Sequence, residues 1–136
     1  MSVIVAVSGG FDPMHAGHVQ LFELASKIGK VVVILNSDDW LTRKKGKAWM
    51  EFKDRAYVLQ SCRFVTGVVP VDDSDDTVCQ ALREMRPDFF ANGGDRVSSN
   101  TPELFVCKKI GVEMLFNVGG EKIYSSSDVE TTGTSS

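Results

Sequence analysis

Two histidines beside closely spaced glycines are the residues of this sequence best suited to chemistry. His15 and His18 are the only histidines, and both lie in Gly-Gly-Phe-Asp-Pro-Met-His-Ala-Gly-His, residues 9–18, hereafter the phosphate turn. A spacing of three residues places both imidazoles on one side of the first turn of a helix. The glycines allow close approach to the backbone, and amides at a helix start attract phosphate. The pattern therefore predicts a phosphate-binding site.

Other known motifs do not fit this turn. No Gly-Lys-Ser or Gly-Lys-Thr follows the glycines, so the turn is not a P-loop, and it lacks the Gly-x-Gly-x-x-Gly spacing of dinucleotide-binding folds. A His-x-x-His pair could also hold a metal, but no third ligand follows at a suitable spacing. We therefore predict no protein-bound metal at the histidines.

A second candidate group is Arg-Lys-Lys-Gly-Lys at residues 43–47, hereafter the basic segment. Such a run is often only a solvated loop. Here it follows Asn-Ser-Asp at residues 36–38, directly after a predicted strand, and the sheet would bring it to the same edge as the histidines. A third group, Asn-Gly-Gly-Asp-Arg at residues 92–96, could be a simple turn, but it follows another strand at the same edge.

The elements that must position these groups alternate along the chain. Apolar runs rich in β-branched residues predict strands, and apolar residues at helical spacing predict helices. We expect strands at 3–7, 31–35, 68–71, 88–91 and 112–116 and helices at 17–28, 53–62, about 77–85 and 101–110. Residues 36–50 are expected to form a loop, and the acidic turn 72–76 is expected to cap the next helix.

This alternation predicts an α/β fold with a Rossmann-like, parallel five-stranded sheet and helices on both faces. One domain over residues 1–130 is expected, because 136 residues with 43% hydrophobic composition can build one core. Residues 131–136 have little to bury and are expected to be a disordered tail.

Composition narrows the class of protein further. A net charge of −3 argues against nucleic-acid binding, which usually needs a basic surface. Three widely spaced cysteines suggest neither a disulfide framework nor a zinc site. No signal peptide and no run of 18 apolar residues is seen, so we expect a cytoplasmic protein without a membrane partner.

The phosphate turn resembles the His-x-Gly-His signature of the cytidylyltransferase-like nucleotidyltransferase superfamily, and the resemblance extends from residue 3 to about residue 129. It implies that His15 and His18 contact a nucleoside triphosphate and stabilise charge as pyrophosphate leaves, without a covalent intermediate. It also implies a homodimer. Further nucleotide-binding positions that it implies in the turn are Gly9, Gly10, Phe11 and Asp12.

The resemblance assigns phosphates of the triphosphate or the acceptor to cations and neighbouring groups. Lys44, a candidate catalytic residue, and Lys47 would reach these phosphates near Asp38. Arg55 would join them, although a surface or ion-pairing role fits the sequence equally well. Arg63 would also bind phosphate, because residues 59–65 resemble a segment of glycerol-3-phosphate cytidylyltransferases with such an arginine.

Two loops complete the implied site. The loop after the fourth strand would receive the base and ribose, with Asp95 also supporting the metal region. The segment 122–128 resembles the closing motif of the family, although its serines are also ordinary helix caps, and its lysine stands where the family usually has arginine. The positions implied are Asn92, Gly93, Asp95, Arg96, Ser125, Ser126 and Ser127 for the nucleotide, and Lys122 for catalysis.

By this resemblance, we expect an enzyme that transfers CMP from CTP to a small phosphorylated polyol such as glycerol 3-phosphate, with Mg²⁺ neutralising the triphosphate. The alternative is an adenylyltransferase that uses ATP and a sugar phosphate, of the heptose-1-phosphate type, which residues 36–38 and 93–95 resemble. A nucleotide-sensing module without catalysis is a third possibility on the same fold.

Overall fold

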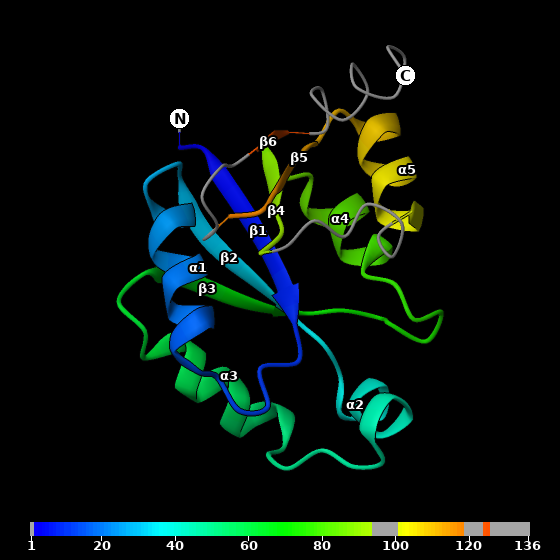
Figure 1. The fold of residues 1–136 in the computed structure, drawn as a ribbon. Helices are drawn as coiled ribbons and strands as arrows, with labels where there is room; N and C mark the ends of the chain where they lie inside the picture. The colour runs from blue at the N-terminus through cyan, green and yellow to red at the C-terminus, as the bar shows by residue number, and fades with distance from the viewer. Residues whose placement is uncertain (1, 94–100, 119–123, 126–136) are drawn as a thin grey trace.

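The computed structural model describes residues 2–93, 101–118 and 124–125. These residues form one sheet in the order β3-β2-β1-β4-β5-β6 (Figure 1). The first five strands along the chain are parallel, which confirms the predicted Rossmann-like sheet, and β6 is antiparallel to β5. The strands are β1 Ile4–Gly9, β2 Lys30–Leu35, β3 Val65–Pro70, β4 Phe89–Ala91, β5 Glu113–Phe116 and β6 Tyr124–Ser125.

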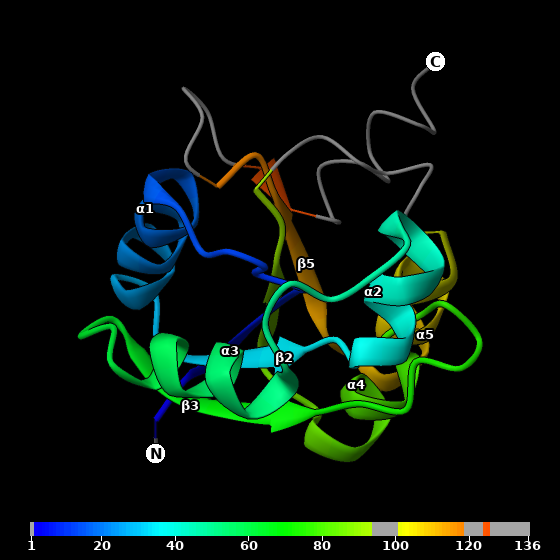
Figure 2. The ribbon, with the colours of Figure 1, turned by 90° about the horizontal axis from the view of Figure 1, so that it is seen from below.

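Helices cover both faces of the sheet (Figure 2). Side chains alternate between faces along β1, so Val5 and Val7 pack with α1 and α3, whereas Ala6 packs with α4 and α5. This explains why β1 is apolar at every central position rather than at alternate ones. The helices are α1 Ala16–Ser26, α2 Asp38–Lys45, α3 Phe52–Gln60, α4 Cys79–Met85 and α5 Thr101–Ile110.

Helix α2 corrects the loop expected over residues 36–50. Its first turn is capped by Ser37, whose hydroxyl accepts a hydrogen bond from the Trp40 amide at 3.0 Å. Acidic residues occupy its first turn and basic residues its last, which complements the helix dipole. Gly46 then ends the helix with φ 94°, a conformation that glycine adopts without strain. These local signals outweigh the low apolar content of the segment.

The acidic turn 72–76 was also expected to cap the next helix, and this is wrong. Helix α4 begins only at Cys79, and its N-cap Val78 has no side-chain cap. Instead, the Val78 amide donates to the buried Glu103 carboxylate of α5 at 3.2 Å. The Thr77 hydroxyl accepts from the Cys79 amide at 3.2 Å, so Thr77 and a tertiary contact, rather than the acidic turn, satisfy the first amides of α4.

The strand order places the predicted groups at one edge. The order reverses between β1 and β4, which are neighbours although two strands separate them along the chain. Ligands in such sheets bind beyond the carboxyl ends of the strands at this point. In Figure 1, α2 also lies beyond the carboxyl end of β1. The turns after β1, β2 and β4 are thus the parts of the fold from which a site can be built.

Within the part of the chain that the structure describes, no helix is both long and apolar enough to cross a membrane. The cysteines Cys62, Cys79 and Cys107 are all free, and the last two are buried. The tail predicted at residues 131–136 lies outside the described residues.

Two glycines offer a test of how tightly the sheet packs. A Cβ added at Gly29 would lie 2.5 Å from the Val3 carbonyl oxygen, whereas at Gly67 nothing lies within 4 Å. We expect Gly29→Ala to lower the free energy of unfolding by about 1–3 kcal/mol, because the backbone at Val3 would have to move to relieve the overlap. Gly67→Ala should change it by less than ~1 kcal/mol. Urea denaturation measures both, and equal effects would contradict the close approach at Gly29.

Candidate active site

His15 and His18 form a capping box at the start of α1. His15 is the N-cap residue, and its Nδ1 accepts a hydrogen bond from the Gly17 amide at 3.1 Å. The His18 Nδ1 accepts from the His15 amide, also at 3.1 Å. The two rings are stacked with 3.7 Å between their centroids. The spacing of three residues therefore brings the imidazoles together as the sequence predicts.

These hydrogen bonds decide which nitrogen carries the proton. A ring nitrogen that accepts an amide hydrogen is unprotonated, so each neutral imidazole carries its hydrogen on Nε2. Burial, together with a smaller contribution from the neighbouring His15, lowers the pKa of His18 to about 4. Near neutral pH, His18 therefore offers its Nε2–H as a donor without a permanent charge, which suits an oxygen that gains negative charge during reaction.

The Phe11 ring packs against His18 and the core rather than facing a ligand. Its ring is buried and contacts the His18 ring edge-on, with 4.8 Å between centroids, and the Phe22 ring at 5.4 Å. This corrects the expected nucleotide contact for its side chain. At Gly10, an added Cβ would lie 2.6 Å from Leu41 Cδ2 of α2, so glycine permits the turn and α2 to pack closely.

Asp12 was also expected at the nucleotide, but its carboxylate faces the protein. Its side chain is 1% exposed and forms an ion pair with Lys45 at 2.9 Å. It accepts hydrogen bonds from the amides of Trp49 at 2.7 Å and Met50 at 2.9 Å. Burial opposes ionisation, but these partners outweigh it and hold the pKa of Asp12 below its usual value. No local feature of the sequence indicates this pairing.

Two of the four cations of the basic segment have carboxylate partners among the described residues, and the other two do not. Arg43 donates to the Asp76 carboxylate and to the Asp73 carbonyl oxygen, and Lys45 pairs with Asp12. Lys44 and Lys47 are exposed. Lys44 lies 5.6 Å above the Trp40 ring, and neither lysine forms an ion pair among the described residues. The two expected phosphate-binding lysines are thus the ones that remain available.

Arg55 is fully buried, which corrects its expected contact with a phosphate. Its guanidinium donates to the carbonyl oxygens of Met50, Gly10 and Asn36 at 3.0, 2.9 and 2.8 Å. It also pairs with the carboxylate of Asp38, the other residue expected there. Arg55 is therefore occupied inside the protein, and the ion-pairing alternative describes it better. The Asp38 side chain is 44% exposed, so its expected place near the phosphates stays a prediction.

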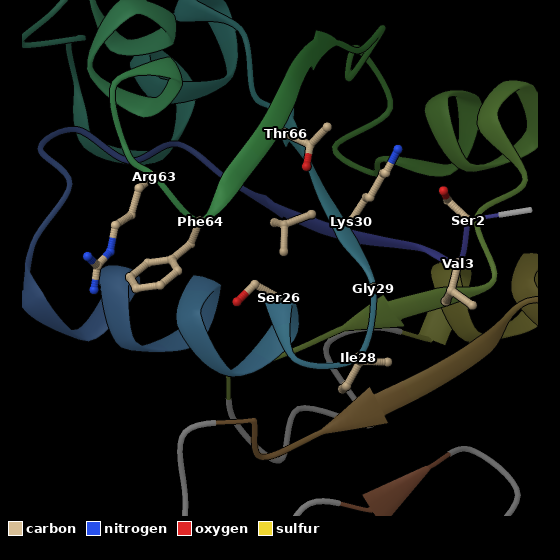
Figure 3. A pocket seen from close by; sticks show the side chains of 10 residues that line it. Ser2, Val3, Ser26, Ile28, Gly29, Lys30, Arg63, Phe64 and Thr66 are labelled. Carbon is tan, nitrogen blue, oxygen red and sulfur yellow. The ribbon is translucent and has the colours of Figure 1, made fainter.

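Arg63 lies between α3 and β3, on the face of the sheet that α1 and α3 cover. It precedes β3, and therefore stands at the amino end of the parallel strands. Its guanidinium lies 4.8 Å from the Phe64 ring, beside a shallow pocket of about 490 Å³ (Figure 3). Lys30, the first residue of β2, and Gly29 before it line the same pocket. Arg63 also lines a second pocket, of about 700 Å³, together with Met14 of the phosphate turn and Val19 of α1, so its expected phosphate contact stays a prediction.

The structure describes the loop after β4 only as far as Gly93. The Asn92 amide donates to the Leu115 carbonyl oxygen at 2.8 Å, which fixes the end of β4 to β5. Gly93 is exposed, and a Cβ there would lie 3.8 Å from Leu21 of α1. Ser125 belongs to β6 beside Leu115. The candidates Asp95, Arg96, Lys122, Ser126 and Ser127 lie outside the described residues.

Asp73 is a structural contributor that sequence reasoning missed. Its buried carboxylate accepts from the Asn36 side chain at 3.0 Å, the Ser37 amide at 2.9 Å and the Ser37 hydroxyl at 2.7 Å. Burial would raise the pKa of Asp73, but these hydrogen bonds lower it. It therefore fixes the turn between β2 and α2 from the loop after β3. No local pattern identifies such a contact between distant loops.

The pKa of His18 predicts how stability depends on pH. An ordinary histidine takes up its proton near pH 6.5, whereas His18 in the fold does so only at about 4. Between these pH values the unfolded chain therefore binds more protons than the folded chain. The contribution of His18 to the free energy of unfolding is fully present above about pH 6.5 and decreases as the pH falls towards 4.

Urea denaturation of the wild type and His18→Asn at several pH values between about 7.5 and about 4.5 measures this contribution. The variant should lose less stability over that range, because carboxylates contribute equally to both proteins. Equal losses would contradict the lowered pKa.

With this geometry established, the chain can be compared with known proteins. A family profile described as cytidylyltransferase-like matches residues 6–131. The chain belongs to this family. The match spans the phosphate turn, both stacked histidines and the basic segment.

Curated relatives of this cytidylyltransferase-like chain include two kinds of protein. The bifunctional protein HldE of Streptomyces coelicolor is 38% identical over 111 residues, which cover 79% of this chain and 24% of that relative. HldE of Sulfurimonas denitrificans is 38% identical over 95 residues, covering 68% and 20%. FAD synthase of Pyrococcus abyssi is 31% identical over 94 residues, covering 68% and 63%. The chain thus spans about a quarter or less of these HldE proteins.

A solved structure supports the fold of the family. The crystal structure of the lipopolysaccharide core biosynthesis protein from Thermoplasma volcanium GSS1 superposes with a TM-score of 0.70 at 18% identity. The match covers 82% of this chain and 91% of that chain. At this identity the likeness establishes the Rossmann-like architecture alone.

The relatives correct the expected substrates. Transfer of CMP from CTP to a polyol phosphate is wrong as the first expectation, because the matching proteins are HldE and FAD synthase. They point to adenylyl transfer from ATP, which was the alternative. The signature that the sequence resembles is common to enzymes of either base, so it did not discriminate between them.

Proposed function

We propose that this protein transfers AMP from ATP to a phosphorylated small molecule of the sugar-phosphate class and releases pyrophosphate. The observation that carries the proposal is the stacked pair His15 and His18, whose Nε2–H groups remain as donors at the start of α1. The preference for ATP rests on the relatives.

The geometry accounts for the reaction without a covalent intermediate. An oxygen of the acceptor phosphate attacks the α-phosphorus, a new P–O bond forms, and the bond to pyrophosphate breaks. Both histidine donors hydrogen-bond to phosphate oxygens, and Lys44 and Lys47 add positive charge to the same region. An acceptor phosphate is already ionised near neutral pH, so the step needs no strong general base.

Mg²⁺ fits this reaction as a partner of the triphosphate. The histidine Nδ1 atoms are occupied by amides, and no group of three or more possible ligands occurs among residues 2–93, 101–118 and 124–125. Mg²⁺ usually keeps several waters and binds through substrate phosphates, where it neutralises their charge. The residues of this chain would then orient the phosphates.

FMN is a second candidate acceptor. FAD synthase of Pyrococcus abyssi matches over 63% of its own length, far more than the HldE proteins do. Transfer of AMP to the phosphate of FMN uses the same attack on the α-phosphorus. Only the surface that holds the acceptor would differ.

Pyrophosphate release tests the proposal. Wild-type protein with Mg²⁺ is supplied with ATP, CTP, GTP or UTP against a panel of sugar 1-phosphates, glycerol 3-phosphate and FMN. We expect turnover with ATP and a sugar phosphate, and chromatography identifies the adenylylated product. A preference for CTP would contradict the proposal, FAD formation would select the second acceptor, and nucleotide binding without turnover would favour a sensor.

The homodimer implied by the family resemblance also remains a proposal, as do the cytoplasmic location and the single domain over residues 1–130. Sedimentation equilibrium measures the mass of the particle in solution, and a monomer at micromolar concentration would contradict the dimer.

A further inference from the structure

We propose that Asp12 and Arg55 are positioning residues that fix the basic segment against the phosphate turn, so that Lys44 and Lys47 are held ready for the phosphates. This inference rests on the proposed function. It goes beyond that function because it assigns two residues that would touch neither nucleotide nor acceptor.

Asp12 connects the phosphate turn to the basic segment and to the residues that follow this segment. It lies in the phosphate turn, three residues before His15, yet its carboxylate binds Lys45 and the amides of Trp49 and Met50. The Lys45 ammonium also donates to the Asp12 carbonyl oxygen at 2.8 Å. One almost fully buried side chain therefore satisfies two consecutive amides and one cation from a separate element.

Arg55 joins three segments at once. Its guanidinium binds the Gly10 carbonyl in the phosphate turn, the Asn36 carbonyl at the end of β2, and the Met50 carbonyl before α3. Its fourth partner is the Asp38 carboxylate in the first turn of α2. Because Met50 donates its amide to Asp12 and its carbonyl accepts from Arg55, the two residues act on the same point of the chain.

These contacts leave Lys44 and Lys47 on a backbone fixed at both sides. The Asp38 contact holds the chain before Lys44. The Asp12 contacts hold it at residue 45, between the two lysines, and at residues 49 and 50, after them. Long lysine side chains lose conformational freedom when they bind, and a fixed backbone reduces the reorganisation that remains. Preorganised cations stabilise phosphates better than mobile ones.

Tryptophan fluorescence can report how firmly residues 36–52 are held. The two tryptophans of the sequence, Trp40 and Trp49, both belong to residues 36–52. The Trp49 amide binds Asp12, its ring is 71% exposed, and Lys45 lies 5.3 Å from the ring centroid. Fluorescence anisotropy of Trp49 in a Trp40→Phe background therefore reports how firmly this segment is held, without any requirement for turnover.

The central experiment compares Asp12→Asn with Asp76→Asn. Both changes remove the partner of one cation of the basic segment, but Asp76 is exposed and does not link the segment to the phosphate turn. We expect Asp12→Asn to weaken ATP binding, measured by calorimetry with Mg²⁺, by at least ~10-fold and to lower the Trp49 anisotropy. Asp76→Asn should leave both within about twofold.

A cycle with the lysines tests whether Asp12 acts through them. In a Lys44→Ala, Lys47→Ala background, Asp12→Asn should weaken ATP binding further by no more than ~2-fold, because its effect depends on those side chains. A full, additive loss would overturn the proposal and indicate direct contact with the ligand. Unchanged anisotropy in Asp12→Asn would also overturn it.

Arg55→Lys provides an independent second variant, because one ammonium cannot reach the three carbonyls that the guanidinium binds. It should lower the anisotropy in the same direction, and a folded variant with unchanged anisotropy and ATP affinity would overturn the role of Arg55. Wild-type protein that binds no nucleotide would refute the proposed function instead, while the anisotropy comparison would still decide whether the segment is fixed by these residues.

Discussion

His18→Ala is expected to lower kcat for nucleotidyl transfer at least ~100-fold, the usual cost of removing one preorganised donor from a developing oxyanion. The ring places its Nε2–H at the start of α1 because Nδ1 is held by the His15 amide. Alanine removes both groups, whereas the half-buried ring contributes only modestly to the core. Pyrophosphate release under saturating substrates measures the loss, and urea denaturation checks that the variant is folded.

His15→Asn is the matched comparison for this prediction. Asparagine is a preferred N-cap, so its side-chain oxygen can replace the Nδ1 that accepts from the Gly17 amide. Its amide nitrogen is a donor, but the shorter side chain does not reach the position of Nε2–H. We therefore expect normal stability with a large loss of kcat. Either variant with near wild-type turnover would remove that histidine from the reaction.

The second large effect is expected from Lys44→Ala combined with Lys47→Ala. A hydrogen bond to a charged group contributes about 1.5–3 kcal/mol, so losing both should lower kcat/KM for ATP by ~100-fold or more. The two lysines form no ion pair among the described residues, so the fold should tolerate the change. Steady-state kinetics with ATP varied measures the effect.

Arg43→Gln is the control for the lysine variant. It removes a cation from the same segment, but Arg43 is occupied by the Asp76 carboxylate and the Asp73 carbonyl oxygen. Its kcat/KM should stay within about threefold of the wild type, because exposed ion pairs contribute little. A similar loss in both proteins would mean that general positive charge, rather than two available lysines, attracts the nucleotide.

Much of the fold was predictable because its signals are local. Buried strands such as Val31 to Leu35 are continuously apolar. Helix α1 ends at Ser26, two residues before the end that Gly29 predicted. Helix α2 was missed because its apolar periodicity is weak, although Ser37, the acidic first turn and Gly46 all marked it. Capping and charge were the better guides to this segment than hydrophobic spacing.

The sequence by itself determined the chemistry of the phosphate turn. The spacing of His15 and His18 requires both rings on one side of the first turn of α1, and it thereby supplies the capping box that sets their protons. The match of this turn to the family signature indicated nucleotidyl transfer. It left the base undecided, and similarity to HldE and FAD synthase corrected that choice.

Only the tertiary structure decided which charged residues remain for a ligand. Asp12, Arg55 and Lys45 look as suitable as Lys44 in the sequence, but the fold pairs Asp12 with Lys45 and surrounds Arg55 with distant backbone carbonyls. Arg63 precedes β3 instead of following a strand, yet the fold brings it into one pocket with Met14 of the phosphate turn. Charge type is written in the sequence, whereas burial and partners depend on contacts between residues far apart along the chain.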